Sequence, residues 1–179
     1  MGGPGPEGGD MRHASDVTAF SDFVEARSGS LFRTAYLMVG EHQLAQDLLQ
    51  EALVKTLIAW PRLRDRDNVE AYTRRIIVTT SISWRRRRSF HERPSEALPE
   101  RATPDPTEAT VTHDAVVAAL LTVPPRQRAA IVLRYYEDLT EAQTAEVMGC
   151  SVGTVKSQVF AGLTRLRGLL GHSFEEATQ

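Results

Sequence analysis

The side chains best suited to chemistry lie within Leu139–Leu166, where small and hydroxyl-bearing residues surround a lysine. Thr140 and Gln143 have the spacing of a capping box, in which two side chains satisfy the free amides at the start of a helix. Gly149 can take the left-handed conformation that ends this helix, and Ser151 can cap the next one. A short helix, a tight turn and a second helix form the arrangement that places the second helix in a DNA major groove.

The second helix of this motif sorts into two faces at 100° per residue. One face is an apolar stripe made of Val152, Val155, Val159, Leu163, Leu166 and Leu170. The opposite face, flanked by Lys156 and Gln158, carries Gly153, Thr154, Ser157, Ala161 and Thr164. Small and polar side chains let a helix approach base edges closely, and Lys156 can reach a phosphate. On spacing alone, an ordinary helical hairpin with a solvated face explains the pattern equally well.

A second candidate surface lies on a predicted helix over His42–Trp60. The residues on its core-like face are Leu49, Ala52, Leu53, Thr56 and Trp60. Its other face mixes acids with aliphatics, namely Asp47, Gln50, Glu51, Val54 and Ile58. Exposed β-branched aliphatics beside acids favour a partner-binding face over a solvated one. The alternative is that Val54 and Ile58 pack against the preceding helix.

A third candidate surface is strongly basic. From Arg62 to Arg93, ten arginines stand against four acids, a local balance of +6 within a chain of net charge −2. Rings at Tyr72 and Trp84 lie next to these cations, a combination that holds single-stranded bases. The cations expected to contact phosphate are Arg74, Arg75 and the run Arg85–Arg88. The alternative for that run is a solvated helix end that favours the negative pole of the helix dipole.

Helical periodicity defines the elements that must position these faces, and no β alternation competes with it. The predicted helices are Thr18–Gly40, His42–Trp60, Val69–Ser89, Val111–Leu121, Pro125–Tyr136, Thr140–Met148 and Ser151–Leu170, with a polar loop over Arg62–Asn68. The segment Pro94–Asp114, after the third predicted helix, holds one arginine against five acids, and four prolines lie in its part before Thr110. We therefore predict an all-α protein of two small helical domains joined by an extended acidic linker.

Composition excludes several classes of function. Cys150 is the only cysteine, which rules out an intramolecular disulfide framework and a multi-cysteine zinc site. The five histidines are scattered and no carboxylates have metal-ligand spacing, so we expect no metal, no cofactor and no catalytic residue. No apolar run is long enough to cross a bilayer, and the start lacks a signal segment. A cytoplasmic protein with no membrane insertion is expected.

Several strings resemble one known family, the extracytoplasmic-function (ECF) sigma factors of bacterial RNA polymerase. SVGTVKS, preceded by LTEAQTAEVMG and PPRQRAAIVLRYYEDLT, resembles the promoter-reading domain of the family. AQDLLQEALVKT resembles the stretch that grips the coiled-coil clamp of the polymerase β′ subunit. The pattern RRIIVTT…SWRR is similar to the actinobacterial SigE-like subgroup. The resemblance spans about Phe20–Leu170.

The resemblance implies a sigma factor that binds core RNA polymerase and directs promoter-specific initiation by reading −10 and −35 elements. The residues it implies for the β′ clamp are Asp47, Gln50, Glu51, Val54 and Ile58. Those implied for −10 DNA are Arg64, Asn68, Tyr72, Arg75, Thr79, Trp84, Arg85 and Arg86. Those implied for −35 DNA are Ser151, Gly153, Thr154, Lys156, Ser157 and Phe160. Further implied partners are the polymerase β flap and an anti-sigma factor.

The resemblance also implies a division of the chain. It assigns 1–15 to a disordered tail, 16–92 to sigma region 2, 93–110 to the acidic linker, 111–171 to sigma region 4 and 172–179 to a tail. The sequence departs from the family at Gln158 and Ala161, where arginine is common, and at Thr79, where many relatives have asparagine. Losing two cations predicts a weaker attraction for phosphate. The competing class is a free-standing helix-turn-helix regulator, which would bind a specific duplex unaided.

Overall fold

The computed structural model describes the backbone of residues 7–63, 66–91 and 108–176, and the side chains of 15–63, 69–84 and 115–168. Within these ranges the fold is all-helical, as predicted, with no strand. The elements are α1 (Glu7–Val39), α2 (His42–Ala59), the 3-10 turn η1 (Trp60–Arg62), α3 (Arg66–His91), α4 (Glu108–Thr122), α5 (Pro125–Ile131), the π-helical turn η2 (Val132–Tyr136), α6 (Glu141–Met148) and α7 (Val152–Glu176).

Several element boundaries differ from those predicted. Helix α1 begins well before Thr18, and α7 continues past Leu170. The loop predicted over Arg62–Asn68 was wrong at both ends: Arg62 belongs to η1, and Arg66 already begins α3. Helix α4 begins at Glu108, inside the segment assigned to the linker, and residues 93–107 of that linker lie outside the described part.

Helices α1, α2 and α3 form a first unit. Their core is a cluster of Leu31, Ala35, Ala45, Leu48, Ala52 and Ile77, each almost fully buried. The hydroxyls of Thr56 and Thr73, both fully buried, lie 2.9 Å apart and join α2 to α3. At the far end, the Phe20 ring meets the Trp60 ring edge-on, with centroids 5.1 Å apart. These contacts fix how the α2 and α3 faces are presented.

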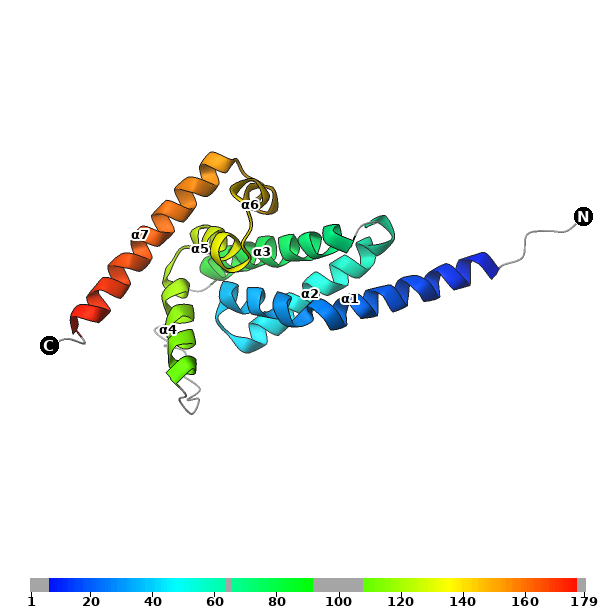
Figure 1. The fold of residues 1–179 in the computed structure, drawn as a ribbon, viewed down its shortest axis with the longest axis horizontal. Coiled ribbons are helices and arrows are strands. Elements are labelled where there is room, and N and C mark those ends of the chain that lie inside the picture. Colours follow the sequence, from blue (N-terminus) through cyan, green and yellow to red (C-terminus); the bar gives the residue numbers. More distant parts are fainter. Residues whose placement is uncertain (1–6, 64–65, 92–107, 177–179) are drawn as a thin grey trace, which may run out of the picture.

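Helices α4 to α7 form a second unit at the C-terminal end of α1, with α7 as its outermost helix (Figure 1). Helix α5 packs directly on α7, because Gly162 leaves no side chain in the way of Ile131. The Arg128 guanidinium is fully buried and donates to the carbonyl oxygens of Leu120, Leu121 and Val123 at the end of α4. Arg128 thus caps the negative end of that helix.

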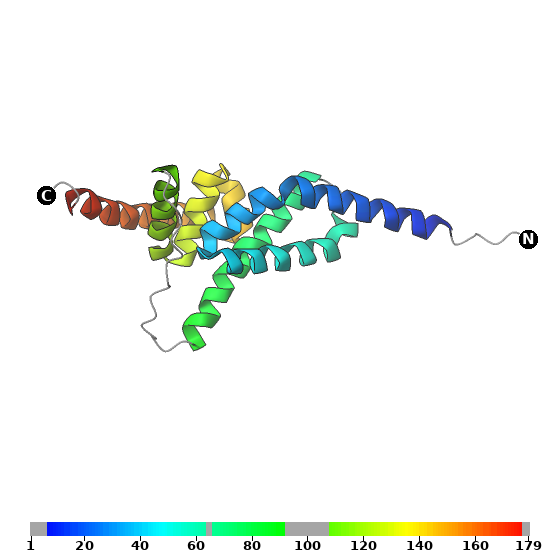
Figure 2. The same ribbon diagram turned by 90° about the horizontal axis from the view of Figure 1, so that it is seen from below.

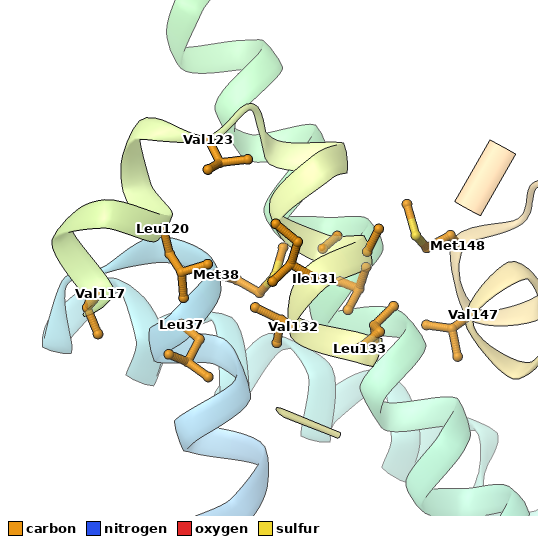
Figure 3. Packing of buried hydrophobic residues seen from close by; sticks show 13 residues of the cluster. Leu37, Met38, Val117, Leu120, Val123, Ile131, Val132, Leu133, Val147 and Met148 are labelled. Atoms are coloured by element: carbon orange, nitrogen blue, oxygen red, sulfur yellow. The ribbon is translucent and has the colours of Figure 1, made fainter. Parts of the chain in front are cut away.

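The two units share one hydrophobic core, which the sequence did not predict. Leu37 and Met38 of α1 and Val78 of α3 pack with residues of the second unit, including Val117, Leu120, Val123, Ile131, Val132, Leu133, Val147 and Met148 (Figure 3). Arg128 also donates across the junction to the Met38 carbonyl oxygen, 2.5 Å away. The second unit is therefore docked on one end of the first, while the N-terminal part of α1 extends away from it (Figure 2).

Candidate nucleic-acid and protein interfaces

The helix-turn-helix motif has the local geometry that the sequence predicted. The Gln143 amide donates to Thr140 Oγ1 at 3.2 Å, and the Thr140 amide donates to Gln143 Oε1 at 2.8 Å, which completes the capping box. Gly149 is left-handed, with φ of 61°, and ends α6. The Thr154 amide donates to Ser151 Oγ at 3.1 Å, so Ser151 caps the start of α7. These three local signals are confirmed.

Helix α7 turns its polar face outward. Val155 is fully buried, and Val159, Leu163 and Leu166 pack on the core of the second unit. Val152 was predicted to point inward, but 37% of it is exposed at the first position of the helix. The residues assigned to −35 DNA lie on the outer face of the helix, and only Thr154 among them is half-buried. They are Ser151, Gly153, Thr154, Lys156, Ser157 and Phe160.

Two features of this outer face bear on DNA binding. Phe160 is 71% exposed, a large apolar side chain with no core role. Lys156 Nζ lies 3.4 Å from Glu141 Oε2 at the start of α6, and the two side chains are 62% and 41% exposed. An exposed pair of this kind is weak and screened by salt, so Lys156 can exchange Glu141 for a phosphate at little cost.

The outer face of α2 is exposed as the partner-binding interpretation requires. Val54 is 56% exposed and Ile58 75% exposed, so the alternative in which they pack on α1 is wrong. Leu57, which sequence reasoning left out, is 46% exposed and enlarges the apolar part of this face. The acids and amide of the face remain accessible. Glu51 accepts from Lys55 at 2.6 Å, an exposed contact within the same helix.

The residues assigned to −10 DNA are only partly described. On α3, Arg75 and Thr79 are exposed and Tyr72 is half-buried on the same side of the helix. The Thr79 hydroxyl donates to the Arg75 carbonyl oxygen at 2.7 Å. Trp84 packs against the core of the first unit, which leaves only part of its ring available. Arg64 and the side chains of Asn68, Arg85 and Arg86 lie outside the described residues.

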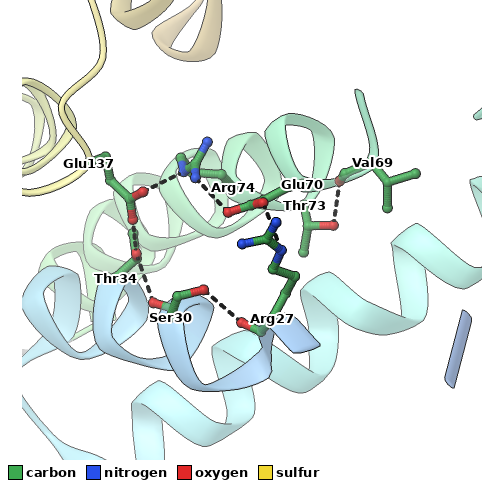
Figure 4. A network of polar contacts seen from close by, with 8 residues as sticks. All are labelled: Arg27, Ser30, Thr34, Val69, Glu70, Thr73, Arg74 and Glu137. Atoms are coloured by element: carbon green, nitrogen blue, oxygen red, sulfur yellow. Dashed lines mark hydrogen bonds and ion pairs between the residues drawn. The ribbon is translucent and has the colours of Figure 1, made fainter. Parts of the chain in front are cut away.

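Arg74, expected to contact phosphate, is instead held inside a polar network (Figure 4). Its Nη2 lies 2.9 Å from Glu70 Oε1, and its Nε lies 2.9 Å from Glu137 Oε2 of the second unit. Arg27 of α1 reaches the other oxygen of Glu70 at 3.2 Å. Only 13% of the Arg74 side chain is exposed, so it offers no free cation to DNA in this arrangement.

None of the helices, as far as the structure describes them, has the length and hydropathy needed to cross a membrane. Across the same residues, no three His, Cys, Asp or Glu side chains gather where they could hold a metal ion.

The fold and these faces define a helix-turn-helix protein of two helical units. The family model "Sigma-70 region 2" matches residues 23–91, and "Sigma-70, region 4" matches residues 113–166. The chain belongs to the sigma-70 family of RNA polymerase sigma factors, among its ECF members, the class of protein that directs promoter-specific transcription initiation.

Named relatives agree with this assignment, and a solved structure shares the fold. The chain is 38% identical over 157 residues to the RNA polymerase sigma-E factor of Streptomyces avermitilis, covering 88% of this chain and 87% of the relative. It is 38% identical to that of Streptomyces coelicolor over 85% and 86% of the two chains. In fold it is similar to the sigma factor RpoE of Bartonella quintana, whose structure was solved in complex with the anti-sigma factor NepR. The TM-score is 0.67 at 23% sequence identity, and the match covers 86% of this chain and 97% of RpoE.

Proposed function

We propose that the α2 face docks this chain on the β′ clamp of core RNA polymerase. The observation that carries the proposal is the exposure of Val54 and Ile58 beside Asp47, Gln50 and Glu51 on one side of a helix. Exposed aliphatics provide apolar area to bury, and the carboxylates provide acceptors for arginines, which bind such groups strongly in a bidentate, partly desolvated geometry. The β flap is the second proposed contact on the polymerase, with the second unit.

We propose that the outer face of α7 reads the −35 element and that the exposed face of α3 contributes to −10 recognition. On α7, small polar side chains can approach base edges while Lys156 contacts a phosphate. On α3, Arg75 supplies charge and Tyr72 a ring beside it. The connection between α3 and α4 then sets the promoter spacing that the protein accepts.

We infer two further properties from the family. Since two solved structures of similar fold are complexes with anti-sigma factors, an anti-sigma factor that covers the α2 face is the proposed regulator. Because the sigma factor's target is RNA polymerase, we place the protein in the cytoplasm. We propose that it acts by binding and recruitment and carries no catalytic site of its own.

A charge reversal tests the polymerase-binding face. Glu51→Arg places a cation where the clamp is expected to present its own, so core polymerase should no longer co-purify with the variant. Glu25→Arg reverses an exposed charge on α1, outside the face, and should leave co-purification intact. Core polymerase retained by folded Glu51→Arg would refute the assignment of this face to the clamp.

In vitro transcription tests the DNA-reading faces. Core polymerase with this protein on a promoter library should enrich a −10 and a −35 word. Lys156→Ala and Ser157→Ala should lower initiation from templates that carry the enriched −35 word and leave templates without it unchanged. An equal loss on both kinds of template would argue against α7 as the −35 reader.

A further inference from the structure

The middle of the α7 outer face is a stripe of four exposed residues, which we call the central stripe. Gly153, Ser157, Phe160 and Thr164 follow one another at intervals of three or four positions, so they line up along one side of the helix. Phe160 is the largest side chain among them and is 71% exposed. The central stripe is therefore the part of α7 that can lie deepest in a major groove.

The hydroxyl groups of this face already use their protons within the protein. Ser157 Oγ donates to the Thr154 carbonyl oxygen and Thr164 Oγ1 donates to the Phe160 carbonyl oxygen, each at 2.9 Å. A hydroxyl has a single proton, so Ser157 and Thr164 can accept a hydrogen bond from a base but have no proton left to donate. Recognition of a base through a hydroxyl donor is therefore not available along the central stripe.

Gly153 makes room at the start of the central stripe. Its backbone is not left-handed, and an added Cβ would meet only Ser151 Oγ, at 3.8 Å, so the fold itself does not require glycine here. Glycine is also a poor helix former. Its missing side chain lets another molecule approach the helix backbone closely. Gly153 and the small Ser157 thus permit a close approach, and the Phe160 ring is the bulky group next to them.

An exposed phenyl ring on a DNA-facing helix suits one feature of the base pairs. In the major groove, the C5-methyl group of thymine is the apolar group that the base edges present, and aromatic side chains pack on it. Removing a methyl group from water is worth about fourfold in binding. Lys156 lies beside the central stripe and can hold a backbone phosphate while the ring faces the bases.

We propose that Phe160 selects thymine in the −35 element by packing on its C5-methyl group. This inference rests on the proposed −35 role of α7 and specifies how that face discriminates between bases. Lys156 positions the helix on the DNA backbone, and Ser157 and Thr164 can accept from an exocyclic amino group of a base. The −35 word therefore contains an A·T pair opposite Phe160, with thymine on one strand or the other.

Replacing thymine by deoxyuridine removes this methyl group and leaves base pairing unchanged. The test is in vitro transcription by core polymerase with the full chain, on templates that carry the enriched −35 word. One −35 thymine at a time, on either strand, is replaced by deoxyuridine. At the position opposite Phe160, the replacement should lower initiation about fourfold. Deoxyuridine in the spacer between the two promoter elements should leave initiation unchanged.

Three variants separate the methyl contact from other roles of these side chains. Phe160→Ala should lower initiation from the thymine template and make the thymine and deoxyuridine templates equal. Its exposed ring has no core role, so thermal denaturation of the variant should match that of the wild type. Ser157→Ala should lower initiation from both templates and keep their ratio. Tyr135→Ala removes a ring that is 64% exposed outside α7 and should also keep the ratio.

The outcomes distinguish this proposal from the proposed function of α7. Equal initiation from thymine and deoxyuridine templates at every −35 position would overturn the selection of thymine by Phe160. A ratio that survives Phe160→Ala, or an enriched −35 word without an A·T pair, would overturn it as well. Each of these results leaves α7 as the −35 reader. Initiation that depends on no −35 word would overturn both the proposal and that role of α7.

Discussion

Removing the Arg128 guanidinium should strongly destabilise the protein. Its side chain is fully buried and reaches four carbonyl oxygens, those of Leu120, Leu121, Val123 and Met38, at distances of 2.5 to 3.0 Å. Arg128→Met keeps most of the aliphatic volume and removes the guanidinium from all four acceptors, of which the Leu120 oxygen also accepts from the Val123 amide at 3.1 Å.

The expected loss in the free energy of unfolding follows from the carbonyl oxygens that lose the guanidinium. Each buried polar group left unsatisfied costs about 1–3 kcal/mol. Relief from burying a charge offsets part of this sum, so a net loss of about 3–5 kcal/mol in the free energy of unfolding is expected. For a chain of this length, that loss lowers the melting temperature by about 10 °C. Arg128→Lys keeps the charge but has fewer donors in a different geometry, so it should lose about half as much.

Urea denaturation followed by circular dichroism measures this effect. The matched control is Arg126→Met, an exposed arginine in the same helix, which should lie within about 0.5 kcal/mol of the wild type. If Arg128→Met lost less than about 1 kcal/mol, the buried guanidinium would not be the link that we describe between α4, α5 and α1.

Three further changes test the packing and the local geometry by thermal denaturation. Gly162→Ala places a Cβ 2.6 Å from Ile131 Cδ1, so the free energy of unfolding should fall by about 1 kcal/mol. The control is Gly168→Ala on the exposed side of α7, where the new Cβ meets no atom and the protein should gain about 0.5 kcal/mol of stability. The same sign for both would contradict the close approach of α5 and α7. Thr140→Ala breaks the capping box and should cost about 1 kcal/mol, with restoration by Ser and not by Val. Gly149→Ala forces a side chain to φ of 61° and should cost about 1–2 kcal/mol.

The sequence by itself determined the local features of this protein. The capping box at Thr140, the left-handed Gly149 and the Ser151 cap involve residues a few positions apart, so the chain's own stereochemistry specifies them. Helical periodicity likewise placed Val54 and Ile58 on the outside of α2, because an amphipathic helix has one core face. The strings SVGTVKS and AQDLLQEALVKT, which resemble the ECF sigma factors, then indicated the class of protein.

Tertiary structure decided the rest. Val152 lies on the apolar stripe, yet 37% of it is exposed at the start of α7, whereas Val155, three positions further on, is fully buried. Arg74 reads as a phosphate contact in the sequence, yet Glu137 holds it between the units. Contacts such as Arg128 to Met38, ninety positions apart, depend on how two finished units dock. An amphipathic face shows that something must cover it, but only the packed structure shows which partner does.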